Sequence, residues 1–149
     1  MRWVSVRMKM LNLTVAAFTI DAYEKVYNLW EACDGIALSS ADSRSSIQMY
    51  LERNPGLSLI AYDGQTIAGT ILCGHDGRRG YLHHLAVRAD YRRQGIGRLL
   101  VAKSVAALEA SGIKKCHLFI YHDNTSGIEF WENIGWTYRQ DIGVVSKNL

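Results

Sequence analysis

Several features that mark particular classes of protein are missing from this sequence. It has no run of 18 apolar residues and no N-terminal apolar core of a signal peptide, so neither a membrane span nor a secretory leader is predicted. Its three cysteines are scattered, without a Cys-x-x-Cys pair or a Cys/His spacing typical of zinc, so no metal site is predicted. Isolated thiols of this kind suit a reducing compartment, and we expect a cytoplasmic protein.

A large excess of charge of one sign is missing as well. The formal net charge is +3, from 17 basic and 14 acidic residues, and no run of lysines or arginines occurs. This balance gives no reason to expect a nucleic-acid or membrane partner. The basic residues that do cluster are Arg88, Arg92, Arg93 and Arg98, and this local group suits a polyanionic small molecule better than a DNA backbone.

The sequence does contain enough apolar residues to form the core of one ordinary domain. It has 149 residues, 48% of them hydrophobic, and shows neither an internal repeat nor a linker-like stretch. We expect a single domain over residues 10–149. Residues 1–9 match no clear element, and Met8 and Met10 are alternative starts, so we interpret residues 1–9 as a non-native or overextended N-terminus.

The spacing of apolar residues and the turn signals predict a series of strands and helices. Their order is β-α-α-β-β-β-α-β-α-β, in which an antiparallel meander precedes a β-α-β crossover. This order predicts an α/β (α+β) fold with a mixed, mostly antiparallel central sheet and helices on both faces. The expected strands span residues 12–18, 57–62, 66–73, 81–87 and 116–121, and the expected helices span residues 19–34, 40–53, 96–110 and 125–134, followed by a hairpin-like region from residue 135.

The most informative stretch is the turn at residues 92–97, which joins a predicted strand to a long predicted helix. Gly95 and Gly97 leave backbone N–H groups uncovered and allow a ligand to come close. The N–H groups of the first helical turn have no intrahelical acceptor, and the helix dipole adds roughly half a positive charge there. Such a turn is an anion site that suits a pyrophosphate.

Other glycine-rich phosphate motifs fit this turn less well. A dinucleotide-binding fingerprint needs a third glycine three residues after Gly97, where Leu100 stands. A Walker-type loop needs Gly-Lys-Ser/Thr, which is absent. Taken alone, the Gly-x-Gly pattern is equally consistent with a turn that only starts a helix.

With its flanking residues, the stretch resembles the GNAT superfamily of acetyl-coenzyme A-dependent N-acetyltransferases. Residues 85–87, 91–97 and 99–100 match that family's Arg/Gln-x-x-Gly-x-Gly signature, together with the strand before it and the helix after it. Residues 124–136 match a second element of the family, with an Asn, a Phe-aromatic pair and a Gly-aromatic pair. The resemblance covers the chain from about residue 10. It implies the GNAT fold and an acetyltransferase that uses acetyl-CoA.

The resemblance also implies which residues hold the coenzyme. The main chain of Leu85, Ala86 and Val87 would pair with the pantetheine arm, and Asn124, Phe130 and Trp131 would contact or flank the coenzyme. Helix capping by Asn124 and core packing by Phe130 are the alternatives. The pyrophosphate would be held by Arg92, Arg93, Gln94, Gly95, Ile96, Gly97 and Arg98.

The resemblance implies direct attack of an amine on the thioester, and two residues are our catalytic candidates. His83 stands where some relatives carry a catalytic His or Glu. The ordinary histidine pKa of about 6.5 suits a base that works near neutral pH. The alternative is a histidine that only packs against its neighbours. Strand alternation predicts that His84 faces the opposite side of the sheet. Trp131 occupies the place of the tyrosine that many relatives use as an acid, so Tyr121, or else Tyr138, is the substitute candidate.

The acceptor pocket in such folds is formed by the first two helices and their loop. Trp30 and Asp34 are therefore the candidate acceptor contacts, against the alternatives of a core residue and a helix end.

Three functions stay open: acetylation of a primary amine on a small metabolite, acetylation of a protein N-terminus or lysine, and a non-catalytic CoA-binding module. Family members often form homodimers, which makes a homodimer an expected assembly.

Overall fold

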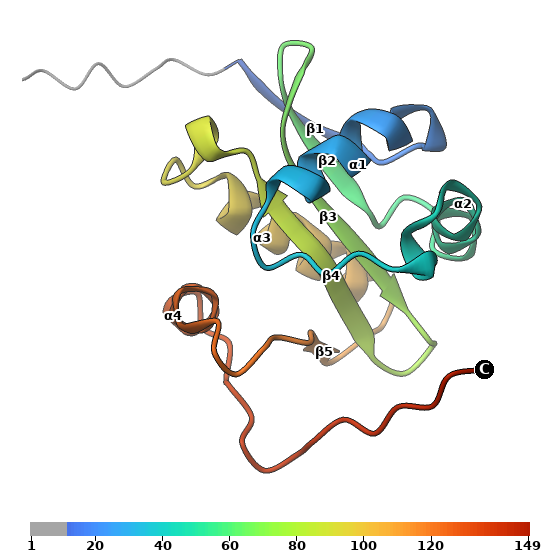
Figure 1. The fold of residues 1–149 in the computed structure, drawn as a ribbon, viewed down its shortest axis with the longest axis vertical. Coiled ribbons are helices and arrows are strands. Elements are labelled where there is room, and N and C mark those ends of the chain that lie inside the picture. The colour runs from blue at the N-terminus through green and yellow to red at the C-terminus, as the bar shows by residue number, and fades with distance from the viewer. Residues whose placement is uncertain (1–11) are drawn as a thin grey trace, which may run out of the picture. The chain divides into compact units, whose positions relative to one another are not determined.

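The computed structural model describes residues 12–149, so the interpretation of residues 1–9 lies outside the described residues. The chain divides into two compact units, of which the first ends at Leu118 and the second spans Phe119–Leu149. Figure 1 shows both units as ribbons, and each is described by itself.

The first unit contains the predicted strands and helices up to residue 118. Its long helix has the bounds that the sequence predicted, residues 96–110. Three short 3-10 turns, η1 (Ile20–Ala22), η2 (Ser40–Asp42) and η3 (Ala89–Tyr91), precede its helices. The main elements are β1 (Leu13–Ala17), α1 (Tyr23–Ala32), α2 (Arg44–Arg53), β2 (Leu59–Asp63), β3 (Thr66–His75), β4 (Gly80–Val87), α3 (Ile96–Ala110) and β5 (Cys116–His117).

The central sheet is mixed, as the element order predicted. Its strands lie in the order β1-β2-β3-β4-β5, with antiparallel pairs from β1 to β4 and a parallel pair between β4 and β5. Helices cover both faces of the sheet (Figure 1). On one face, Trp30 of α1 donates a hydrogen bond to Thr70 of β3, whereas a Cβ on the adjacent Gly69 would meet Leu100 of α3 on the other face.

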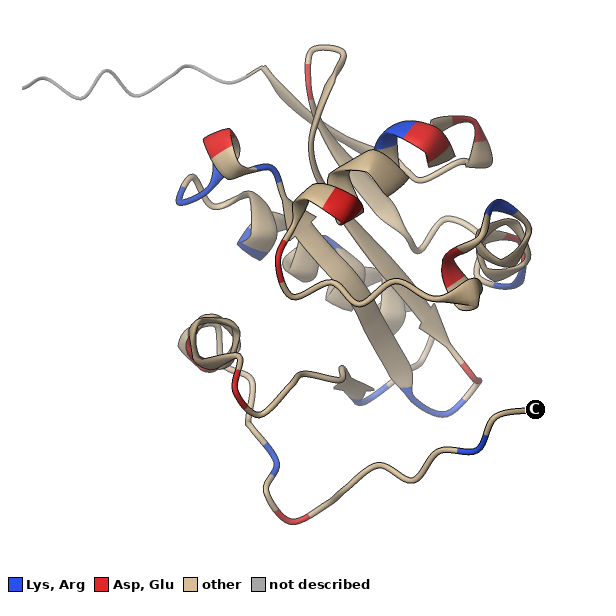
Figure 2. Ribbon diagram, in the orientation of Figure 1, with Lys and Arg blue, Asp and Glu red and all other residues tan. Residues whose placement is uncertain are grey.

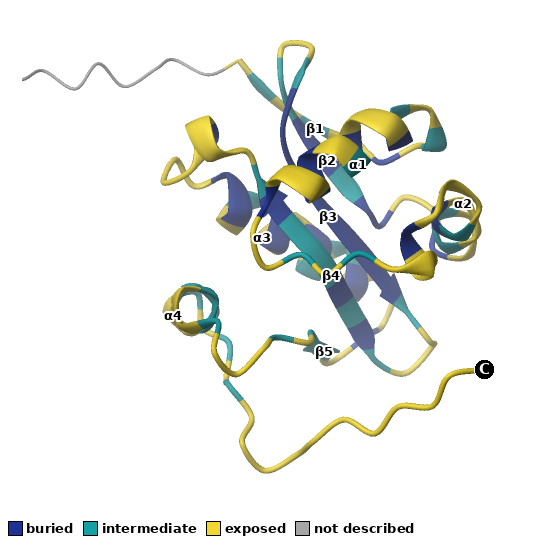
Figure 3. Cartoon of the chain, in the orientation of Figure 1, coloured by how far each residue is buried: buried dark blue, intermediate teal, exposed yellow. Residues whose placement is uncertain are grey.

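The core lies between this sheet and its helices, where Figure 3 shows the buried segments. Trp30, Val26 and Ile47 pack from α1 and α2 onto Ile60 and Leu72 of the sheet. On the other face, α3 buries one side of its 15 residues. Among residues 12–149, no helix has the length and apolar character that crossing a bilayer requires.

A β-bulge interrupts β4 and changes the direction of its side chains. Thr70 pairs with Ala86 but Leu72 pairs with His83, so β4 has one more residue than β3 over this stretch. The extra residue places His84 in the left-handed region, with φ 49°. The ring of His84 packs against Trp30, and the ring of His83 packs against Tyr50. The prediction that His84 faces away from His83 is therefore wrong, because strict alternation fails at a bulge.

The fifth strand is shorter than the sequence predicted. It spans Cys116–His117 instead of residues 116–121, and it pairs only with Gly80 and Tyr81 of β4. Within residues 12–118, the stretch of β4 from residue 82 to 87 therefore has no strand on this side.

The second unit contains one helix, α4 (Thr125–Asn133). Asn124 caps it, because its Oδ1 accepts a hydrogen bond from the N–H of Gly127 at 3.0 Å. The hairpin expected from residue 135 is absent, since no strand occurs in residues 119–149. A strand needs a hydrogen-bonded neighbour, and this unit provides no other strand to pair with.

We expect Gly74→Ala to destabilise the first unit. A Cβ at this position would lie 2.6 Å from the Tyr50 hydroxyl and 2.8 Å from Cγ of Asn54, and Asn54 is held by the backbone N–H of His75. The neighbouring groups must shift to make room for this Cβ, so the free energy of unfolding should fall by about 1–3 kcal/mol. Urea titration measures the loss, with Gly143→Ala as the control because nothing lies within 4 Å of its added Cβ. Equal midpoints for the two variants would contradict this packing.

Candidate active site

The turn before α3 has the geometry of an anion site. Arg93 and Gly95 have left-handed backbones, with φ 60° and 81°, and Gly95 is the N-cap of α3 without a side chain to cap it. The N–H groups of Ile96, Gly97 and Arg98 lie in the first turn, where a helix offers no backbone acceptor. Because the side chain of Ile96 is buried, only its N–H could serve a ligand. These donors fit a pyrophosphate.

The arginines near this turn differ in what they contact. Figure 2 shows basic residues in the loop before α3 and in its first turn, where Arg93 and Arg98 are exposed. Arg92 instead donates its Nε–H to the carbonyl oxygen of Val87 at 3.1 Å and lies 4.0 Å from the thiol of Cys33. Its guanidinium therefore fastens the loop to the end of β4. The side chain of Gln94 reaches the carbonyl oxygen of Asp90 at 3.5 Å.

The end of β4 that leads into this turn is paired on one side only. Ala86 and Val87 pair with Thr70 and Gly69 of β3, whereas β5 does not extend along them or along Leu85. An extended group with amide donors and acceptors can bind to such an edge as a further strand does. The predicted pantetheine contacts of residues 85–87 are compatible with this edge and stay a prediction.

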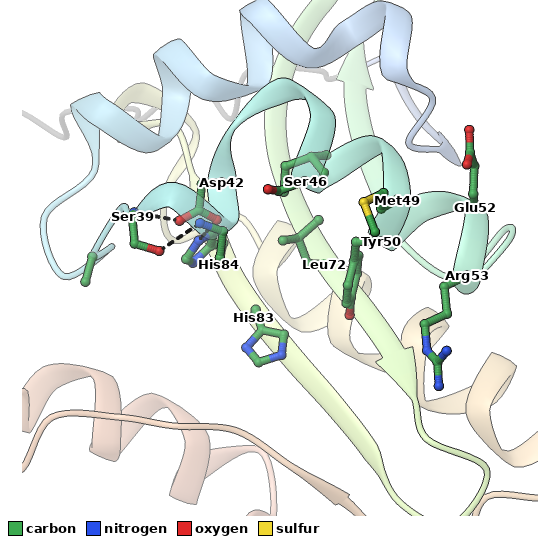
Figure 4. A pocket seen from close by; sticks show the side chains of 13 residues that line it. Ser39, Asp42, Ser46, Met49, Tyr50, Glu52, Arg53, Leu72, His83 and His84 are labelled. Atoms are coloured by element: carbon green, nitrogen blue, oxygen red, sulfur yellow. Dashed lines mark hydrogen bonds and ion pairs between the residues drawn. The ribbon is translucent and has the colours of Figure 1, made fainter. Parts of the chain in front are cut away.

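A pocket of about 750 Å³ opens on the face of the sheet that carries α1 and α2. Its floor is formed by Leu72, His83 and His84, and its wall by η2 and α2. Figure 4 shows these side chains around the opening. The remaining lining residues are Ala37, Ser39, Ala41, Asp42, Ser46, Ile47, Met49, Tyr50, Glu52 and Arg53.

His83 is the predicted base, and it lies in this pocket. Its ring stacks on Tyr81 at 6.5 Å between centroids with 8° between planes, and Tyr50 lies at its edge. Burial lowers the pKa of His83 below its ordinary value of 6.5, and the neighbouring His84 lowers it further, against a smaller opposing effect of Asp42. His83 is therefore neutral at pH 7 and able to accept a proton.

A second histidine in the pocket is bound to a carboxylate. His84 Nε2 lies 2.7 Å from Oδ1 of Asp42, and both side chains are largely buried. The other carboxylate oxygen of Asp42 accepts the backbone N–H of Ser39 at 2.9 Å, which completes a capping box on η2. Sequence analysis missed this pair. The Ser-x-x-Asp spacing could have indicated the cap, but no local signal links Asp42 to a histidine 42 residues away.

The two predicted acceptor contacts lie elsewhere. Trp30 is 1% exposed and belongs to the core, where its indole N–H donates to Oγ1 of Thr70 at 3.1 Å. The prediction that Trp30 contacts the acceptor is replaced by this core role, because the ring is covered on all sides. Asp34 is exposed beyond the end of α1 and is not among the residues that line the pocket.

The second unit carries the other predicted site residues. Tyr121 is 63% exposed, and Asn124 is the cap of α4. Phe130 and Trp131 meet edge to face at 5.2 Å, and Trp131 also contacts Trp136 at 4.8 Å. Within this unit, Phe130 and Trp131 thus form a half-buried aromatic cluster. Their coenzyme contacts and the role of Tyr121 stay predictions.

Comparison with known proteins gives a consistent family. The acetyltransferase (GNAT) family model matches residues 23–136. An acetyltransferase of Sodalis glossinidius is 31% identical over 137 residues, which cover 92% of this chain and 96% of that protein.

Two solved structures show the same fold at low identity. A structure of the NatC complex bound to Gag peptide and CoA has a TM-score of 0.72 at 21% identity, covering 86% of each chain. An aminoglycoside acetyltransferase from an uncultured soil metagenomic sample, in complex with sisomicin, has a TM-score of 0.69 at 16% identity, covering 92% of this chain and 96% of that one. From the family model and the identity to its relatives, this chain belongs to the acetyltransferase (GNAT) family and is an N-acetyltransferase.

Proposed function

We propose that this chain moves the acetyl group of acetyl-CoA to the primary amine of a small metabolite held in the pocket beside β4. The observation that carries the proposal is that β4 combines three features of a candidate active site. β4 presents His83 to the pocket. From residue 82 to 87 it pairs with β3 but has no strand on its other side within the first unit, and it leads into α3, which starts without a side-chain cap.

The coenzyme would be held by backbone donors and by exposed cations. The N–H groups of residues 96–98 suit its pyrophosphate, with Arg93 and Arg98 adding charge and Leu85 and Val87 offering main-chain groups to pantetheine. From the family resemblance, Asn124, Phe130 and Trp131 of the second unit are proposed as further coenzyme contacts. When bound, acetyl-CoA supplies an activated acetyl group as a thioester.

The acceptor amine must lose a proton before its nitrogen can attack. An alkylamine is mostly an ammonium ion near neutral pH, so a group in the pocket has to accept a proton. We propose His83 as the base that takes a proton from the nitrogen during the attack. The lowered pKa of His83 keeps the ring neutral at pH 7, which is the form that this step needs.

The pocket favours a small amine with an apolar body. Its volume of about 750 Å³ is in the usual range for small ligands, and Ile47, Met49 and Leu72 give it apolar surface. Apart from the histidines, the charged side chains that line it are Asp42, Glu52 and Arg53, which sum to one negative charge. A polycation would find little net negative charge here, so we propose a monoamine in preference to a polyamine.

A panel of acceptors tests this function directly. With acetyl-CoA present, we expect thioester consumption to rise well above hydrolysis for apolar monoamines, and less for polyamines and for peptides with free N-termini or lysines. A rise with peptides alone would instead support the protein-modifying alternative. CoA binding by calorimetry without turnover on any acceptor would support a non-catalytic module and contradict the proposal.

The anion site predicts that exposed arginines near α3 strengthen coenzyme binding. We expect Arg93→Ala and Arg98→Ala each to raise the Kd for CoA roughly tenfold, because each variant loses a charge-assisted contact to phosphate. Arg78→Ala, an exposed arginine in the turn between β3 and β4, is the charge-matched control and should leave the Kd unchanged. Equal affinities of all three variants, measured by calorimetry, would place the phosphates elsewhere.

The role of His83 predicts a loss of rate without a loss of coenzyme affinity. We expect His83→Gln to lower kcat roughly 100-fold, because glutamine cannot accept the proton, while the Kd for CoA is retained. In the wild-type protein, NMR titration of the His83 ring should give a midpoint below 6.5, in the direction that its burial requires. A variant with the wild-type kcat would remove His83 from the mechanism.

A further inference from the structure

The pair of His84 and Asp42 is a feature of the pocket that the role of His83 leaves unused. His84 Nε2 and Asp42 Oδ1 are 2.7 Å apart, and the two side chains are only 17% and 7% exposed. A carboxylate at this distance orients an imidazole and favours the tautomer with its proton on Nε2. Nδ1 is then the nitrogen of His84 that can accept a proton.

Both members of the pair are fixed by other contacts. The ring of His84 packs against Trp30 with centroids 4.9 Å apart. Asp42 accepts the N–H of Ser39 through its carboxylate, and its main-chain carbonyl accepts the hydroxyl of Tyr23 at 2.7 Å. Such rigid support from outside the reacting group is what holds a catalytic side chain in one orientation.

Stabilisation of the fold alone does not explain why His84 and Asp42 form a buried pair. Taking an imidazole and a carboxylate out of water costs free energy, and an apolar pair of similar size often gives equal stability. The pair also lines the pocket, where Figure 4 shows Asp42 and His84 side by side, and His83 lines the same pocket. The position of the pair therefore points to a role toward the molecule that the pocket binds.

The reaction itself needs two proton transfers from one nitrogen. Acetylation of an ammonium ion forms one C–N bond and breaks one C–S bond, and the nitrogen loses two protons in all. The first must leave before the nitrogen lone pair can attack, and in the overall balance it reaches solvent once the base that accepted it is deprotonated again. The second leaves with the attack, and the departing thiolate sulfur gains a proton in the overall balance.

We infer that His84 accepts the first of these protons, from the ammonium form of the acceptor, and that Asp42 is its positioning residue. Asp42 fixes the tautomer of His84 and balances the charge of the imidazolium that forms. His83 remains the base for the second proton. The charged and titratable side chains that line this pocket are Asp42, Tyr50, Glu52, Arg53, His83 and His84. This inference rests on the proposed function.

Steady-state kinetics of the full chain with an accepted amine test the inference. We expect His84→Ala to lower kcat roughly 100-fold with an unchanged Kd for CoA, and imidazole added to the buffer to restore part of the rate. Asp42→Asn should lower kcat as well. It should add nothing in the His84→Ala background, because Asp42 acts through His84. A merely structural role of Asp42 would give an additional loss in the double variant.

A matched control separates this role from support of the nearby turn. Ser43→Ala removes the hydroxyl that accepts the N–H of Ser46 at the start of α2, next to Asp42, but leaves the pair with His84 intact. It should cost about 1 kcal/mol of stability and keep the wild-type kcat. Should His84→Ala fold poorly, His84→Gln replaces it as a variant that still bonds to Asp42 but accepts no proton.

The outcomes distinguish the inference from the function beneath it. A wild-type kcat in the folded His84 variant, or independent losses in the double variant, would overturn the inference while the enzyme remains an acetyltransferase. A wild-type protein that acetylates no amine of the panel would overturn the proposed function, and the inference would fall with it.

Discussion

In β4, the left-handed backbone of His84 adds one residue opposite β3 and turns its imidazole to the side of the sheet on which His83 lies. Without this bulge, consecutive residues would face opposite sides, and only one histidine could reach the pocket. A non-glycine residue in this conformation costs about 1–2 kcal/mol. The bond to Asp42 and the packing on Trp30 are contacts that can offset this cost.

The same strand connects the pocket to the anion site. From His84, β4 continues with β3 on one side and, within residues 12–118, no strand on the other side, and then enters the turn that starts α3. Arg92 bonds back to Val87 and so ties this turn to the end of the strand. A ligand with a phosphate end and a thioester end could therefore contact one continuous strand, loop and helix.

Features that depend on neighbouring residues could be predicted from the sequence, and features that depend on distant ones could not. The bounds of α3 followed from Gly95, Gly97 and the apolar spacing after them. The bulge, the bond between Asp42 and His84 and the Arg92 contact all depend on tertiary packing. Trp30 has the helical spacing of a core residue and proved to be one, so its proposed acceptor contact had no local support. The hairpin expected after α4 lacked a strand to pair with in its own unit.

The central claim is that the bulge in β4 brings His83 and His84 to the nitrogen of the same acceptor amine. A crystal structure of the chain with CoA and the acetylated product of an accepted amine would test it most directly. We expect the amide nitrogen of the product to lie within hydrogen-bond reach of the His83 and His84 rings, directly or through one water molecule. A product bound away from these two histidines, with neither ring near its nitrogen, would contradict the account.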